Sequence, residues 1–206
     1  MSIVVISGII GVGKTTLCEN IKKIGYKIAR EDVKDNVFLK MFYNENHKNK
    51  NTNEIKNKYA FHNQLFFIKL FHENLIKNIG KSSNDELIIF DRYIFESVHV
   101  FSQCFKNYMS KDEWDLYMYI AKEFMNFMPQ PKKIIYLTAD IKTIMERIKK
   151  RSANIDETID ENYILNLKNI YDDYMNCIPN VEIINTTNMN EKEVTDYATN
   201  ILKNIN

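Results

Sequence analysis

Short apolar runs alternate with longer amphipathic segments along this chain. Between the apolar runs, hydrophobic residues recur at the three- and four-residue spacing of an α-helix. Five runs have the composition of buried parallel strands, at residues 3–7, 26–29, 87–90, 133–137 and 181–184. Helices are predicted over 13–24, 37–42, 59–78, 95–106, 110–128, 140–150, 161–176 and 191–203. This alternation predicts an α/β fold, a single doubly wound domain with a five-stranded parallel sheet flanked by helices.

Two segments between these elements have distinct local patterns. Residues 44–57 are almost wholly polar, which predicts a surface loop with no side chains for the core. Ser110 and Glu113 have the spacing of a capping box, which predicts that a helix begins there. In that helix, Trp114, Met118, Ala121 and Met125 form the expected apolar stripe.

Composition narrows the function classes without choosing one. The length of 206 residues suits one domain, and the net charge of +1 offers no electrostatic case for nucleic acid or an anionic membrane as partner. The three cysteines, Cys18, Cys104 and Cys177, are odd in number and far apart, so neither a disulfide framework nor a zinc site is indicated. With no targeting segment apparent, a cytoplasmic location is expected.

The segment after the first strand carries the strongest chemical signal. Gly8, Gly13, Lys14 and Thr15 match the phosphate-loop pattern, in which backbone N–H groups and a helix N-terminus wrap a polyphosphate. Lys14 would reach the β- and γ-phosphates, and the Thr15 hydroxyl would ligate Mg²⁺. Three of the chain's 5 glycines fall in this loop, which argues against a chance match. The chain is therefore predicted to bind a nucleotide.

Charged residues follow two other predicted strands. Glu31 comes after the second strand, and Asp91 and Arg92 come directly after the third. The carboxyl ends of parallel strands meet at one edge of a sheet, so these groups are expected to lie over the phosphate. They would supply a second ligand for Mg²⁺, a cation for the phosphoryl group, and a carboxylate that accepts a proton from an attacking hydroxyl.

These motifs together resemble the deoxynucleoside kinase family, whose members transfer the γ-phosphoryl of ATP to the 5′-hydroxyl of a deoxynucleoside. The resemblance covers nearly the whole chain. It implies that Glu31 is the general base and that Asp91 joins Thr15 on Mg²⁺. It also implies that Arg92, Lys14 and Arg151 stabilise the transferring phosphoryl. The residues expected to bind ATP are Gly8, Gly11, Gly13, Lys14, Thr15, Thr16, Arg147 and Arg151.

The same resemblance places the nucleoside and a lid. Gln64 matches the residue that reads the base edge, and Tyr43 and Asp156 fall where the family contacts the sugar 3′-hydroxyl. Residues 147–151 resemble the start of the family's arginine-rich lid, which is expected at about residues 147–158. The implied substrate-binding residues are Glu31, Tyr43, Gln64, Phe67, Phe71, Arg92, Ser97 and Asp156. A homodimer formed through residues 108–128 is also implied.

Departures from the family pattern leave the substrate and the activity open. Phe71 and Ser97 stand where members that favour deoxycytidine or deoxyadenosine carry a charged pair, so an uncharged pocket favours thymidine. Asp32 replaces the proline that is usual in the family. Asn36 stands where many members carry a tryptophan, and Ala153 stands where a lid arginine is expected. A thymidylate kinase is one alternative, although its phosphate loop carries an acid that is missing here. A nucleotide-binding subunit without turnover is the other.

Overall fold

A computed structural model describes residues 1–30, 36–49, 57–80, 86–151 and 160–205. The chain forms two compact units, each made of separate stretches of sequence. Unit 1 contains residues 1–29, 82–92 and 130–206, and unit 2 contains residues 30–81 and 93–129. The chain passes between the units four times, so a single linker does not join them.

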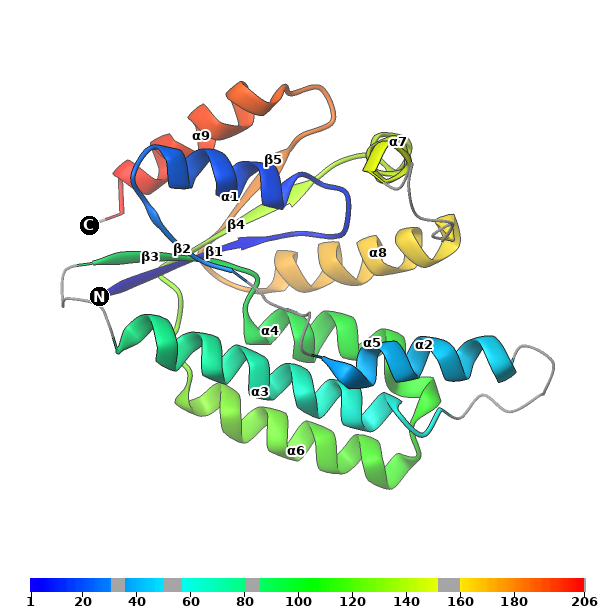
Figure 1. The fold of residues 1–206 in the computed structure, drawn as a ribbon. Coiled ribbons are helices and arrows are strands. Elements are labelled where there is room, and N and C mark those ends of the chain that lie inside the picture. Colours follow the sequence, from blue (N-terminus) through cyan, green and yellow to red (C-terminus); the bar gives the residue numbers. More distant parts are fainter. Residues whose placement is uncertain (31–35, 50–56, 81–85, 152–159, 206) are drawn as a thin grey trace. The chain divides into compact units, whose positions relative to one another are not determined.

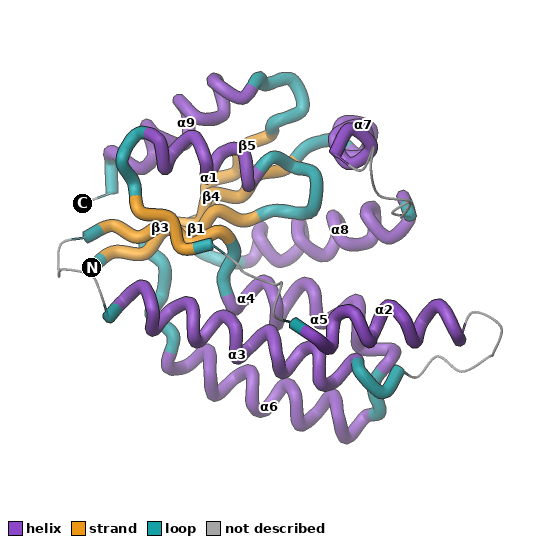
Figure 2. The backbone as a smooth tube through the Cα atoms, viewed as in Figure 1, coloured by secondary structure: helices purple, strands orange, loops and turns teal. Residues whose placement is uncertain are grey.

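Unit 1 is built on a five-stranded parallel sheet, which confirms the predicted fold class. The strands, drawn in orange in Figure 2, run in the order β2-β3-β1-β4-β5. Because β1 has partners on both sides and its residues 3–7 are buried, it is the central strand. The strand bounds are β1 Ser2–Ser7, β2 Lys27–Ala29, β3 Leu87–Asp91, β4 Lys133–Thr138 and β5 Val181–Asn185.

Helices cover both faces of this sheet. Helices α1 and α9 lie together on one face, and α8 crosses the other (Figure 1). Each helix turns an apolar stripe to the sheet, as with the buried Leu17, Cys18 and Ile21 of α1. The helices of unit 1 are α1 Lys14–Lys23, α7 Ile141–Arg151, α8 Glu161–Cys177 and α9 Glu191–Lys203.

Unit 2 is helical in its described residues. Helix α3 packs against both α2 and α6. One end of the unit is filled by Phe42, Ala60, Phe105 and Met109, with the Phe42 and Phe105 ring centroids 4.7 Å apart. Its longer helices are α2 Val37–Asn49, α3 Ala60–Ile79 and α6 Lys111–Phe127. Shorter turns are α4 Ile94–Glu96, the π-helix Ser97–Phe101, α5 Ser102–Phe105 and the 3₁₀ turn Lys106–Tyr108.

The predicted elements agree with the observed ones to within a residue or two, with three corrections. Helix α2 continues to Asn49, into the segment predicted as loop, because a helix satisfies its own backbone hydrogen bonds and does not need an apolar face throughout. The helix predicted over 95–106 contains a π-helical turn. In α6 the buried side chains are Tyr117, which lies outside the predicted stripe, and Ala121, which belongs to it.

The predicted capping box at the start of α6 is confirmed. Glu113 donates its backbone N–H to Ser110 Oγ at 3.2 Å, and Ser110 returns its own N–H to the Glu113 carboxylate at 2.8 Å. Together they satisfy two backbone donors that the first turn would leave unpaired. None of the helices in the described part of the chain is long and apolar enough to cross a membrane.

Candidate active site

The phosphate loop connects β1 to α1, and its glycines adopt conformations that other residues avoid. Gly8, Gly11 and Gly13 have φ angles of 142°, 83° and 107°. A Cβ on Gly8 would lie 2.5 Å from the carbonyl oxygen of Leu137 on β4. A Cβ on Gly11 would lie 2.7 Å from Ile148. The loop is therefore held against neighbouring elements at distances that only glycine allows.

The buried side chain of Lys14 is hydrogen-bonded to the backbone of this loop. It is 7% exposed, and its ammonium group donates to the carbonyl oxygen of Ile9 at 2.9 Å. The N-cap residue of α1 is Gly13, which has no side chain to cap the helix, and Thr15 is exposed in the first turn. The positive end of the helix dipole and a buried lysine thus meet at one loop, which is the arrangement that binds a polyphosphate.

Arg147 supports the loop from α7. Its guanidinium donates to the Val12 carbonyl oxygen at 3.2 Å and to the Thr186 hydroxyl and carbonyl oxygens at 2.8 and 2.9 Å. Thr186 is itself buried, in the segment after β5. These bonds join the phosphate loop, α7 and the end of β5. Sequence reasoning assigned Arg147 to ATP binding, which remains a prediction, and it missed Thr186.

Asp91 and Arg92 lie at the carboxyl end of β3, next to the phosphate loop. Asp91 is in register with Ile6 of β1, and the Arg92 N–H continues the ladder by donating to the Ile6 carbonyl oxygen at 3.1 Å. Arg92 is 7% exposed and has a φ of 69°, which costs about 1–3 kcal/mol for a residue other than glycine. The adjoining strands thus place the half-buried Asp91 carboxylate and the start of the phosphate loop at the same edge.

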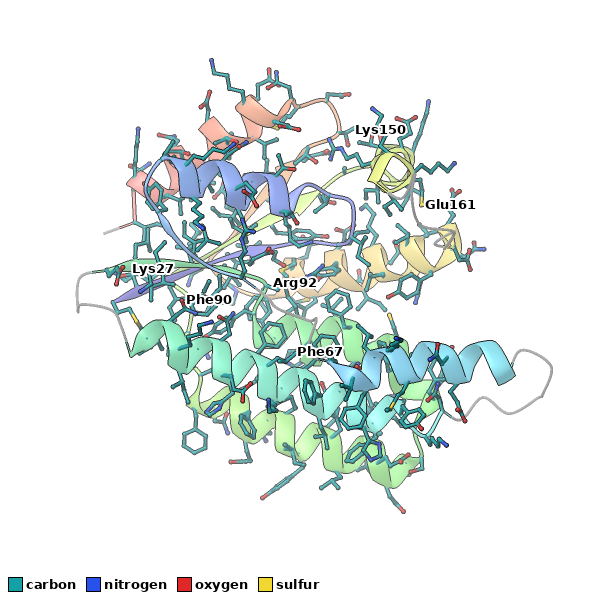
Figure 3. The ribbon with its side chains drawn as sticks, in the orientation of Figure 1. Lys27, Phe67, Phe90, Arg92, Lys150 and Glu161 are labelled. Carbon is teal, nitrogen blue, oxygen red and sulfur yellow. The ribbon has the colours of Figure 1, made fainter. Side chains whose placement is uncertain are left out.

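The Arg92 side chain is directed from the sheet toward α8 (Figure 3). Its Nη1 donates to the hydroxyl oxygen of Tyr171 at 2.6 Å. Tyr171 is fully buried in α8 and stacks on Tyr136 of β4, with ring centroids 5.8 Å apart and planes 11° apart. Sequence reasoning missed Tyr171, because its place after Ile164 and Leu167 gives it the spacing of an ordinary core residue.

Unit 2 contains a group of buried amide side chains. Asn36 donates to Asn63 Oδ1 at 2.8 Å, and its own Oδ1 accepts the backbone N–H groups of Phe38 and Leu39 at the start of α2. Next along α3, Gln64 is fully buried. Among the described residues, neither Gln64 Oε1, Gln64 Nε2 nor Asn63 Nδ2 has a hydrogen-bond partner.

A buried carboxamide without partners is costly. Leaving such a group unpaired costs about 1–3 kcal/mol, which a ligand able to donate and accept would recover. One face of α3 carries Gln64, Phe67 and Phe71. Phe71 is buried, and Phe67, which is labelled in Figure 3, is half-buried. Asn63 is a further candidate that sequence reasoning missed, because an asparagine on a helix is most often a solvated residue.

Ser97 begins the π-helix of unit 2. It is 2% exposed, and π-helical turns are frequent at functional sites. Burial raises the pKa of Tyr117 of α6, and the hydroxyl groups of Ser102 and Ser97 lower it by a smaller amount. Tyr117 is therefore a neutral phenol at physiological pH. Ser97 and Phe71 are both buried, and the uncharged nucleoside pocket expected from them remains a prediction.

Four predicted site residues are described incompletely or not at all. Glu31 and Asp156 lie outside the described residues, as do Asp32 and Ala153. Tyr43 and Arg151 belong to helices α2 and α7, and nothing is described of their side chains. Their functional roles stay predictions.

A match to known proteins decides the family. The family model described as deoxynucleoside kinase matches residues 4–206. The chain belongs to the deoxynucleoside kinase family. It is therefore a member of a phosphotransferase family, and the roles of the phosphate loop, Asp91, Arg92 and Gln64 remain predictions.

Individual members of the deoxynucleoside kinase family resemble the chain over most of their length. The deoxyadenosine/deoxycytidine kinase of Bacillus subtilis (strain 168) is 27% identical over 180 residues, covering 84% of this chain and 76% of the relative. The deoxyguanosine kinase of Lactobacillus acidophilus is 30% identical over 176 residues, covering 79% and 71%. Deoxyadenosine kinase from M. mycoides, solved with bound dCTP, has the same fold, with a TM-score of 0.76 at 23% identity, covering 98% and 100%.

No three His, Cys, Asp or Glu side chains gather into a metal site within the part of the chain that is described. A protein cage for a cation is not required in a kinase, because Mg²⁺ is bound by one or two oxygen ligands and by the phosphates of the nucleotide. The Thr15 hydroxyl and the Asp91 carboxylate are ligands of the kind Mg²⁺ prefers, which keeps both as candidates.

The glycine geometry leads to a paired substitution. We expect Gly8→Ala to weaken ATP binding at least about 10-fold, because the new methyl group meets a backbone oxygen that cannot move without the sheet. Gly25→Ala is the control, because Gly25 also has a positive φ, 102°, but a Cβ there meets nothing within 4 Å. ATP binding measured by calorimetry checks both. Equal losses for the two variants would contradict the close-approach argument.

Proposed function

We propose that this member of the deoxynucleoside kinase family phosphorylates the 5′-hydroxyl of a deoxynucleoside, with ATP as donor, in nucleotide salvage. The buried, unpaired carboxamide of Gln64 carries the proposal. A phosphate loop alone is compatible with many nucleotide-binding proteins. A partnerless donor–acceptor group inside unit 2 calls for a ligand with a matching hydrogen-bonding edge, and a nucleobase has one.

The proposed chemistry is mainly positioning and electrostatics. Glu31 accepts the proton of the 5′-hydroxyl as it attacks the γ-phosphorus, and Lys14, Arg92 and Arg151 stabilise the charge on the transferring phosphoryl. Thr15 and Asp91 would hold Mg²⁺, which supplies charge neutralisation on the β- and γ-phosphates. Arg147, Arg151 and Asp156 would belong to a lid at about residues 147–158 of a single domain spanning the chain.

The base is proposed from the relatives and from two side chains of unit 2. Relatives named for deoxyadenosine, in Bacillus subtilis and Dictyostelium discoideum, make deoxyadenosine the first acceptor to test. Thymidine is the second, because Phe71 and Ser97 are buried and uncharged. Gln64 does not choose between them, because a carboxamide both donates and accepts and therefore pairs with adenine or with thymine.

The direct test offers the four deoxynucleosides and thymidylate with ATP and Mg²⁺. Phosphorylation of at least one deoxynucleoside supports the proposal, and the order of the rates settles the base. Turnover of thymidylate alone would identify a thymidylate kinase instead. The uncharged Ile9 and Val12 argue against that outcome, because a thymidylate kinase carries an acid in its phosphate loop. ATP binding without any product would indicate the non-catalytic alternative.

Gln64→Leu should separate stability from activity. Replacing an unpaired buried amide by an apolar side chain of similar size should leave the Tm unchanged or raise it, while KM for the nucleoside rises about 10-fold or more. Asn57→Leu is the control, because Asn57 is also buried in unit 2 but is paired with the Phe42 carbonyl oxygen and the Tyr59 N–H.

The control variant should behave in the opposite way. Asn57→Leu is expected to lower the free energy of unfolding by about 1–3 kcal/mol and to leave the KM of the remaining folded enzyme unchanged. Thermal unfolding and steady-state kinetics measure both effects. If Gln64→Leu destabilised the protein as much as Asn57→Leu and kept a normal KM, Gln64 would be an ordinary structural residue.

Glu31→Gln tests the general base. The variant should fold and bind ATP normally while kcat falls by about 10²–10⁴-fold, the usual contribution of a positioned base. Glu123→Gln, on an exposed position of α6, is the control for loss of a carboxylate. Turnover close to that of the native enzyme would remove Glu31 from this role.

We also propose that the enzyme is a cytoplasmic homodimer that pairs through α6. Leu116, Tyr119 and Phe127 are 50%, 68% and 83% exposed and fall within one face of that helix. Exposed apolar side chains of this size, gathered on one face, are typical of a protein interface. The implied family dimer, formed through residues 108–128, makes a second copy of the chain the expected occupant.

Phe127→Glu should therefore convert the dimer to a monomer, because it places a charge in the centre of an apolar contact. Lys122→Glu, exposed on another face of α6, is the control and should stay dimeric. Sedimentation velocity over a range of concentrations distinguishes the two states. A native protein that is monomeric at the highest concentration, or a Phe127→Glu variant that remains dimeric, would contradict the assignment.

A further inference from the structure

Arg92 is buried in unit 1, and a guanidinium in such a place needs hydrogen-bond acceptors that keep it in one orientation. One of these is the Tyr171 hydroxyl oxygen, 2.6 Å from Nη1. The two residues are 79 positions apart in the chain. Arg92 directly follows β3, and Tyr171 lies in α8. The contact is therefore a tertiary one, which the backbone ladder of β3 does not itself create.

Tyr171 is held in turn by a second tyrosine. Its ring stacks on Tyr136, whose hydroxyl donates to Asp172 Oδ1 at 2.7 Å. Lys168, one turn earlier on α8, forms an ion pair with the same carboxylate. Tyr136 and Tyr171 are both almost fully buried, so neither ring has room to turn away. The position of the Tyr171 hydroxyl is thus set by β4 and α8 together.

The chemistry of this acceptor matters for a transferring phosphoryl group. The Tyr171 phenol oxygen orients the guanidinium without bringing a charge of its own. Asp172 is next to Tyr171 in the chain, but its carboxylate is engaged by Tyr136 and Lys168. The neutral Tyr171 therefore binds Arg92, whereas the neighbouring acid Asp172 binds Tyr136 and Lys168.

We propose that Tyr171, held by Tyr136, is a positioning residue that fixes the Arg92 guanidinium for phosphoryl transfer. The proposal rests on the function proposed above, in which Arg92 stabilises the transition state. Tyr171 acts only through Arg92 and does not contact the substrate. Its loss should therefore slow the chemical step and leave the binding of ATP and nucleoside nearly unchanged, since a misplaced cation affects the transition state more than the ground state.

Tyr171→Phe removes one oxygen atom and keeps the stacked ring. We expect kcat to fall about 10- to 30-fold while both KM values change less than about twofold and the Tm stays within a few degrees. Tyr197→Phe is the matched control, because Tyr197 is an exposed tyrosine of α9 whose hydroxyl lies 3.4 Å from Glu182. It should keep the native kcat. Rates are expressed per ATP-binding site, so that unfolded protein does not count.

A double-mutant cycle with Arg92→Lys tests whether Tyr171 acts through Arg92. Once the guanidinium is gone, adding Tyr171→Phe should change kcat less than about twofold, because the two residues work as one unit. An equal loss in both backgrounds would contradict the proposal, as would a native kcat in Tyr171→Phe. A fall in Tm with parallel changes in KM and kcat would assign Tyr171 a structural role only.

Tyr136→Phe provides a second variant that leaves the Arg92–Tyr171 bond in place. It removes the hydrogen bond to Asp172 and should lower kcat about two- to threefold without a change in KM. If Tyr171→Phe gives no folded, ATP-binding protein, the Tyr136→Phe variant decides. A native kcat in Tyr136→Phe would then overturn the proposal. The native enzyme is the reference throughout. Its failure to phosphorylate any deoxynucleoside overturns the proposed function, whereas normal native turnover with unaffected variants overturns only the role of Tyr171.

Discussion

The hydrogen-bond ladders on both sides of β1 are the constraint on which the chemistry of unit 1 depends. The strand pairs with β3 through Ile6 and Asp91 and with β4 through Ser7 and Tyr136. Any change in either register would move the phosphate loop relative to the carboxylate and the cation beside it. A parallel sheet buried on both faces resists such a change, because a slip would break every backbone bond of the ladder at once.

The loop itself adds a second constraint, which is the absence of side chains. Gly8 approaches the backbone of β4, and Gly11 approaches α7, at distances that a Cβ would not permit. The loop is thus shaped by its neighbours and not by its own sequence alone. Arg147 completes the arrangement by binding both the loop and Thr186. The chain segments that follow β1, β4 and β5 therefore contact one another.

Local features of the sequence predicted most of this architecture. Buried parallel strands read as continuous apolar runs, as 87–90 does, and the phosphate loop has its glycines and lysine within eight consecutive residues. Contacts between distant residues have no such pattern. Tyr171 resembles any core residue of an amphipathic helix, and its hydrogen bond to Arg92 follows from how α8 packs on the sheet. The polar end of α2 was missed because helices extend beyond the residues they bury.

The candidate site residues of both units are ones that folding alone would not favour. Arg92 is a charged residue that is buried and has a positive φ, and Gln64 is a buried amide that the described residues do not pair. A sequence selected only for stability would replace each with a residue that fits its position at lower free energy. Retaining them reduces the stability of the empty protein, and in Gln64 it leaves hydrogen-bonding capacity for a ligand. Substitutions that stabilise such positions should therefore reduce ligand binding or catalysis, whereas substitutions of satisfied buried polar groups should reduce stability alone. This contrast distinguishes a functional polar residue from a structural one without reference to any other protein.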